Sequence, residues 1–150
     1  MSANSATAAC EQPPATGQQP MPKVRSGITA YLCVSNAAKA AAFYERAFGG
    51  KILLQIPPDE KGRTMHIHLE INGASLMLSD GFPEHGHPVK PHQGYTLHLQ
   101  VDDIDKRFQH AIDAGGEIVL PVQDMFWGDR YGQLRDPFGV MWSMGMTPTR

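Results

Sequence analysis

The sequence has little cysteine, no excess of charge of one sign and no long apolar run, and each shortage excludes a class of protein. Two cysteines in 150 residues cannot build a disulfide framework or a cysteine-based zinc site. A formal net charge of −2, with no block of lysine or arginine, lacks the positive surface that nucleic acid or an anionic membrane attracts. We therefore expect neither partner.

No apolar stretch approaches the roughly 18 residues that a membrane span needs. The N-terminus also lacks the basic start and apolar segment of a secretory signal peptide. Together with the scarcity of cysteine, these features predict a cytoplasmic protein in a reducing compartment.

The chain contains enough apolar material for one globular domain. With 41% hydrophobic residues, 150 positions can build one full-sized core and leave no room for a second. Residues 1–25 consist largely of Ala, Ser, Gln, Pro and Thr, which bury too little apolar surface to offset their ordering entropy. We expect a disordered tail there and a single domain over residues 26–147.

The first part of the domain predicts a strand, a helix and three further strands. A β-rich run, ITAYLCV, leads to Asn36, which can cap an amphipathic helix over residues 37–48 that stops at Gly49-Gly50. The extended segments KILLQI, RTMHIHLEI and ASLMLSD follow, and Asn72-Gly73 is a strong hairpin signal between the last two. Module one, about residues 27–80, is therefore a βαβββ unit.

The same order of elements recurs after a loop at residues 81–93. Placing ITAYLCVSNAAKAAAFYERAFGGKI above YTLHLQVDDIDKRFQHAIDAGGEI aligns Val34 with Val101 and brings two glycine pairs together. The pieces IVLPVQD, RYGQLRD and GVMWSM complete module two, about residues 94–147. The histidines of the intervening loop have no regular spacing, so we interpret that segment as a solvated connection.

A module of four strands and one helix leaves an apolar sheet face uncovered, so two modules must pack together. We expect an α+β fold in which the modules form a curved, partly closed mixed sheet around a central cavity. Because side chains alternate along a strand, polar residues at every second position can reach that cavity from both modules.

The candidate chemical groups lie on the predicted third and fifth strands. His66, His68 and Glu70 share one side of the third strand, and His98 has the corresponding register in module two. If these side chains line the cavity, the three imidazoles could hold a metal, or His66 or His98 could act as a catalytic base. The alternative is a set of half-exposed strand residues above a buried apolar face.

Other side chains are candidates for contact with a ligand. Arg130 could clamp a planar or anionic molecule, or could instead pair with Asp129 or Asp136 and hold its loop. Trp142 could form the cavity wall or belong to the core. The ligand-binding set comprises His68, Glu70, Thr29, Tyr31, Thr96, Trp127, Arg130 and Trp142.

Two segments carry a specific resemblance to a known family. Module one follows the pattern strand, Asn, helix and Phe-Tyr-x-x-x-Phe-Gly-Gly, and module two contains MFWGDRYGQLRDPFGVMW at Met125–Trp142. On these segments and HIHLEINGASLMLSD, the chain from about Gly27 to Thr147 resembles the vicinal-oxygen-chelate superfamily of glyoxalases, bleomycin-resistance proteins and dioxygenases. Within that superfamily it resembles the PhnB-like branch.

The resemblance implies paired modules, a homodimer and, in many relatives, a divalent metal such as zinc, nickel, manganese or iron. Thr29, Thr96 and Ser143 stand where metal-binding relatives carry His, His and Glu, and hydroxyls are weak ligands by comparison. The sequence therefore favours a PhnB-like protein that binds a small organic ligand, with no cofactor certain. A metal-dependent lyase, isomerase or dioxygenase with His66, His68 and His98 as ligands stays open, as does a metal-free enzyme.

Overall fold

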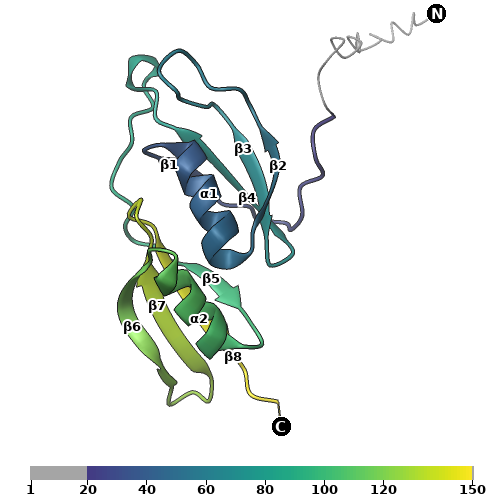
Figure 1. Ribbon diagram of the computed structural model, residues 1–150, viewed down its shortest axis with the longest axis vertical. Helices are drawn as coiled ribbons and strands as arrows, with labels where there is room; N and C mark the ends of the chain where they lie inside the picture. The colour runs from purple at the N-terminus through teal and green to yellow at the C-terminus, as the bar shows by residue number, and fades with distance from the viewer. Residues whose placement is uncertain (1–19, 150) are drawn as a thin grey trace, which may run out of the picture.

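The computed structural model describes residues 20–149, which fold into two modules with the same order of elements (Figure 1). Module one contains β1 (Tyr31–Val34), α1 (Ala37–Phe48), β2 (Lys51–Gln55), β3 (Ile67–Ile71) and β4 (Ala74–Asp80). Module two contains β5 (Leu97–Gln100), α2 (Ile104–Asp113), β6 (Glu117–Asp124), β7 (Arg130–Arg135) and β8 (Met141–Met146). The linker between them contains a 3₁₀ turn, η1 (Pro83–His85). The predicted tail lies outside the described residues up to position 19.

Each module has its own four-stranded mixed sheet, with strand orders β1-β4-β3-β2 and β5-β8-β7-β6. The first strand of each module runs parallel to the last, β1 with β4 and β5 with β8. A parallel pair needs a long crossover, and the helix of each module supplies it while covering one face of the sheet. The predicted α+β fold of two βαβββ modules is confirmed, and within residues 20–149 the two sheets do not close on each other.

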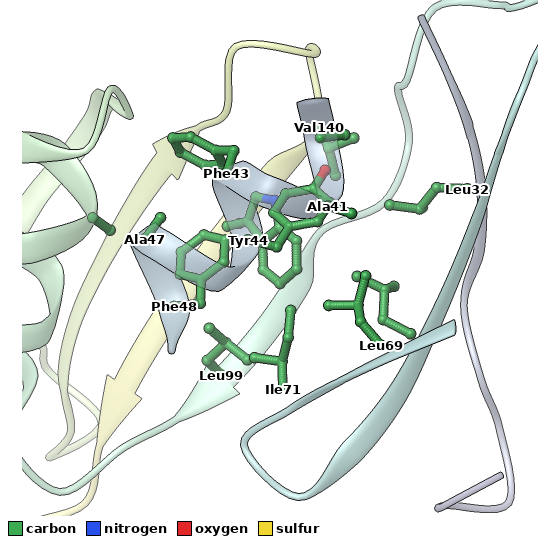
Figure 2. Packing of buried hydrophobic residues seen from close by; sticks show 14 of the residues in the cluster. Leu32, Ala41, Phe43, Tyr44, Ala47, Phe48, Leu69, Ile71, Leu99 and Val140 are labelled. Carbon is green, nitrogen blue, oxygen red and sulfur yellow. The ribbon is translucent and has the colours of Figure 1, made fainter. Parts of the chain in front are cut away.

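The modules share one hydrophobic core, and α1 lies where they meet (Figure 2). Tyr44 and Phe48 of α1 pack on Trp142 of β8, with ring centroids 5.2 and 4.4 Å apart. Leu99 of β5 and Ile71 of β3 belong to the same buried cluster. Trp142 is therefore a core residue, which was one of its two predicted roles.

A buried carboxylate connects the two modules. Asp136, in the turn before β8, accepts hydrogen bonds from the Tyr44 hydroxyl (2.6 Å) and the Trp142 Nε1 (2.9 Å). The backbone N–H groups of Phe138 and Val140 donate to its other oxygen. Burial, followed by the neighbouring carboxylate, raises the pKa of Tyr44, so its hydroxyl stays a donor. The turn residue thus also ties α1 to module two.

Neither described helix is long and apolar enough to cross a membrane.

Candidate functional site

In each module, one sheet face packs against its helix and the opposite face carries no helix. We call the latter the helix-free face. Since side chains alternate along a strand, residues at every second position share this face. In module one they are Tyr31, His66, His68, Glu70, Ser75 and Met77. In module two they are Thr96, His98, Gln100, Tyr131, Gln133, Arg135, Met141 and Ser143.

Tyr31 and His66 form a pair on the helix-free face of module one. The Tyr31 hydroxyl lies 2.6 Å from the Nδ1 of His66 and 3.3 Å from the carbonyl oxygen of Met65. Burial, and then the nearby His68, lower the pKa of His66, while burial raises the pKa of Tyr31. Both groups are therefore neutral near pH 7, and the phenol donates to Nδ1.

His68 is enclosed rather than presented to solvent. Its side chain is 1% exposed, and its Nε2 lies 2.8 Å from the hydroxyl of Ser75. That hydroxyl also accepts the backbone N–H of Arg25 at 2.8 Å, and the Nε of Arg25 pairs with Glu70 at 3.1 Å. These contacts fasten the segment before β1 onto the sheet, and they occupy both His68 and Glu70 with partners within the chain.

A second cluster surrounds His98 in module two. Its Nδ1 lies 2.7 Å from the Ser143 hydroxyl, and its Nε2 lies 2.9 Å from the Oε1 of Gln100. Because an amide oxygen can only accept, the Nε2 carries the proton and the serine donates to Nδ1. The ring stacks on Tyr131 at 16° with centroids 6.0 Å apart. The Nε2 of Gln133 donates to the Tyr131 hydroxyl at 3.0 Å.

Sequence reasoning missed Gly145, whose lack of a side chain leaves room for the His98 ring. A Cβ on this glycine would lie 2.8 Å from the Cε1 of His98 and 3.0 Å from its Nε2. The missing side chain lets the imidazole lie over β8. The available signal was the register, since Gly145 follows Ser143 by two positions and therefore shares its face.

Trp127 joins this cluster from the turn between β6 and β7. Its ring meets Tyr131 edge-on, with centroids 5.7 Å apart, and about half of its surface is exposed. His98, Tyr131 and Trp127 therefore form a continuous surface of rings beside hydrogen-bonding groups. We call this group the ring cluster. A planar organic molecule could stack on it and be oriented by the polar side chains.

Arg130 lies apart from the ring cluster. Adjacent strand residues point to opposite faces, so its guanidinium extends toward α2 while Tyr131 extends away. It pairs with Asp105 at 2.7 Å and with Asp124 at 3.2 Å. The expected partners, Asp129 and Asp136, are not the ones used.

The cavity between the two sheets, where the sequence predicted the ligand site, is small. Its volume is about 200 Å³, and its walls include Ile28 and Ser75 from module one with His98 and Trp142 from module two. Cavities that enclose drug-sized ligands usually measure about 300–1,000 Å³. A ligand of that size would therefore need the open helix-free face as well.

The predicted metal ligands do not converge within the described chain. Over residues 20–149, no three His, Cys, Asp or Glu side chains are grouped so that they could hold a metal ion. His66, His68 and His98 each have a hydrogen-bonded partner and belong to two different sheets. The Thr29 hydroxyl is buried without a partner among the described residues, and Thr96 is exposed. These residues of one chain do not fit the divalent metal site of the metal-binding relatives.

Comparison with known proteins agrees with this fold. The model of the Glyoxalase/Bleomycin resistance protein/Dioxygenase superfamily matches residues 27–144. Protein Mb0911c of Mycobacterium bovis is 40% identical over 129 residues, which cover 81% of this chain and 84% of that protein.

Two solved structures are similar over both modules. TioX from Micromonospora sp. ML1 is 26% identical with a TM-score of 0.64, covering 83% of this chain and 98% of its own. The PhnB protein of Bacillus cereus, described as a putative 3-demethylubiquinone-9 3-methyltransferase, is 25% identical with a TM-score of 0.64 over 81% of this chain and 100% of its own. Since the family match runs through both βαβββ modules, the chain belongs to the glyoxalase/bleomycin resistance protein/dioxygenase superfamily.

Proposed function

We propose that this chain is a cytoplasmic, homodimeric, PhnB-like protein that binds a small organic molecule on the helix-free face of module two. The ring cluster carries the proposal, because it combines a stacked His98–Tyr131 pair, an exposed Trp127 and polar side chains in one place. Aromatic surface supplies affinity for a planar ligand, and the hydroxyl and amide groups supply its orientation.

The cavity between the two sheets is too small to enclose a drug-sized ligand. A ligand on the ring cluster therefore needs a second surface that shields it from water. A ligand on an open face keeps much of its surface in water, which limits the free energy of binding. Apolar side chains stand exposed around the two modules, including Ile28 at 94% and Phe126 at 97%. A second copy of the chain packed on these residues would shield both the apolar side chains and the ligand.

Thermal unfolding with a panel of planar aromatic compounds tests the proposal. A compound that binds the native state raises the unfolding midpoint by mass action, and it should do so for the wild type. Tyr131→Ala and His98→Ala should lose the increase, whereas His85→Ala, an exposed histidine of the linker, should keep it. An increase of equal size in all three variants would place binding elsewhere and refute the proposal.

Metal content tests the alternative of a metal-dependent lyase, isomerase or dioxygenase. Divalent metals should be measured in protein purified without chelators, for the wild type, His66→Ala and His98→Ala. Because the described residues of one chain do not form a metal site, we expect substoichiometric metal that does not depend on these histidines. Near-stoichiometric zinc, nickel, manganese or iron that disappears in the variants would refute the proposal of a metal-free ligand-binding protein. It would support a metal-dependent enzyme instead.

A further inference from the structure

A second cavity opens at one end of the helix-free face of module two. Its volume is about 450 Å³, and its lining includes Tyr95, Thr96, Arg135 and Met141. Within the described residues, no aspartate or glutamate lines it. Its one permanently charged group is therefore the guanidinium of Arg135.

The strand register places the lining of this cavity and the ring cluster on the same sheet face. Tyr131 pairs with Gly145, Gln133 with Ser143 and Arg135 with Met141 along β7 and β8. Tyr131, Gln133 and Arg135 alternate with Leu134 of the core, so all three share the helix-free face. Four residues of extended strand span about 13 Å. The Cα atoms of Arg135 and Tyr131 are therefore about 13 Å apart along β7, on the same face.

Arg135 differs from the other arginines of the β-sheets and their loops. Arg25, Arg63 and Arg130 each form an ion pair with a carboxylate. Arg135 is exposed and has no ion-pair partner in the described part of the chain, although Glu117 is its register neighbour on β6. The adjacent Asp136 directs its carboxylate into the core, toward Tyr44.

The surroundings of Arg135 offer hydrogen bonds as well as charge. Thr96 presents an exposed hydroxyl on the same wall. His92 and Tyr95 form a hydrogen-bonded pair there, and the Nε2 of His92 is buried without a partner among the described residues. A guanidinium can donate two parallel hydrogen bonds to a carboxylate or phosphoryl oxyanion, and neighbouring hydroxyls can add others.

The guanidinium of Arg135 has no ion-pair partner among the described residues, and no carboxylate among them lines its cavity. Because Arg135 also shares a sheet face with the ring cluster, we infer that it forms an oxyanion subsite. The ligand then has an aromatic part that stacks on Tyr131 and an anionic group, carboxylate or phosphoryl, at about 13 Å along β7. This inference rests on the proposed function, since it names the class of molecule that the same face binds.

Three elongated probes of matched shape test the subsite by titration calorimetry with the full chain. They are p-terphenyl-4-carboxylate, p-terphenyl-4-yl phosphate and the neutral p-terphenyl-4-carboxamide, whose three rings in line are long enough to reach from Tyr131 toward Arg135. We expect at least one anionic probe to bind the wild type about tenfold more tightly than the amide, and the better anion identifies the class. Raising the salt concentration should reduce this preference, because the guanidinium is exposed.

Variants separate the subsite from the rest of the face. Arg135→Gln should remove the anion preference and leave the amide affinity unchanged, whereas Tyr131→Ala should weaken all three probes. Lys39→Gln removes an exposed cation of α1 and should change nothing. An anion preference that survives in Arg135→Gln, or equal affinity of the wild type for all three probes, refutes the subsite and leaves the proposed function standing. Absence of binding by all three probes would count against both proposals.

Discussion

The imidazole of His66 makes the stability of the folded protein depend on pH. Its pKa is lowered from 6.5 in the folded protein, first by burial and then by His68. The unfolded chain therefore binds the proton more readily, and stability must fall as the pH decreases through the unfolded pKa. Above that value both states hold a neutral ring, and the full contribution of His66 to stability is present.

We predict that the free energy of unfolding decreases from about pH 7.5 to about pH 5 in the wild type, and decreases less in His66→Gln. Urea denaturation across this range measures the difference between the two proteins. The variant also loses the hydrogen bond to Tyr31, which lowers its free energy of unfolding by a constant amount. Comparing the slopes of the free energy of unfolding against pH removes this constant. Parallel curves for the two proteins would show that His66 is not responsible.

A second residue-scale prediction concerns the room beside His98. Gly145→Ala should push the imidazole off β8, because the new Cβ would lie 2.8 Å from its Cε1. The ring should then leave its stack on Tyr131, and affinity for an aromatic compound should fall several-fold. Ring-proton chemical shifts of His98 report the movement directly. Gly27→Ala is the matched control, since no atom lies within 4 Å of the added Cβ.

Between elements, the carboxylate of Asp136 is a buried polar connection with several partners. It accepts four hydrogen bonds in a buried position, and these join α1, the turn and β8. By contrast, the ion pairs of Arg130 hold α2 and β6 at the surface, where water and salt weaken them.

Asp136→Asn should therefore destabilise the fold by about 3 kcal/mol, since its amide nitrogen cannot accept the bonds that the carboxylate oxygens accept. Tyr44→Phe should cost about 1–2 kcal/mol, and a double-mutant cycle should show that the two changes are coupled. Urea denaturation gives all the values, with Asp102→Asn as an exposed control. Additive effects would mean that the 2.6 Å contact does not contribute to stability.

At the scale of the whole molecule, the exposed apolar side chains argue for association between copies. We predict a homodimer of twice 16.4 kDa by size-exclusion chromatography with light scattering. Phe126→Ser should shift the protein toward the monomer, because Phe126 is 97% exposed on the turn beside Trp127. Val89→Ser, an exposed apolar position of the linker, serves as the control. A wild type that stays monomeric at every concentration would contradict the prediction.

The sequence alone was sufficient for the order of elements. Asn36 caps α1 through a hydrogen bond to the backbone of Lys39, Gly49 follows it in the left-handed region, and Asn72 and Gly73 form a turn with positive φ. These are interactions between near neighbours in the chain, so composition and spacing reveal them. The repeat of this pattern was also sufficient for the two-module fold, whereas the superfamily followed from the resemblance of particular motifs to a known family.

Only the tertiary structure decided which side chains meet. The partners of Arg130, the enclosure of His68 and the space at Gly145 depend on contacts between residues far apart in the sequence. In a sheet, a shift of one residue in register moves every side chain to the opposite face. Local pattern predicts that a strand exists, but the packing of distant strands and helices sets its register. That register places His98, Tyr131 and Arg135 on one face and directs Arg130 away from it.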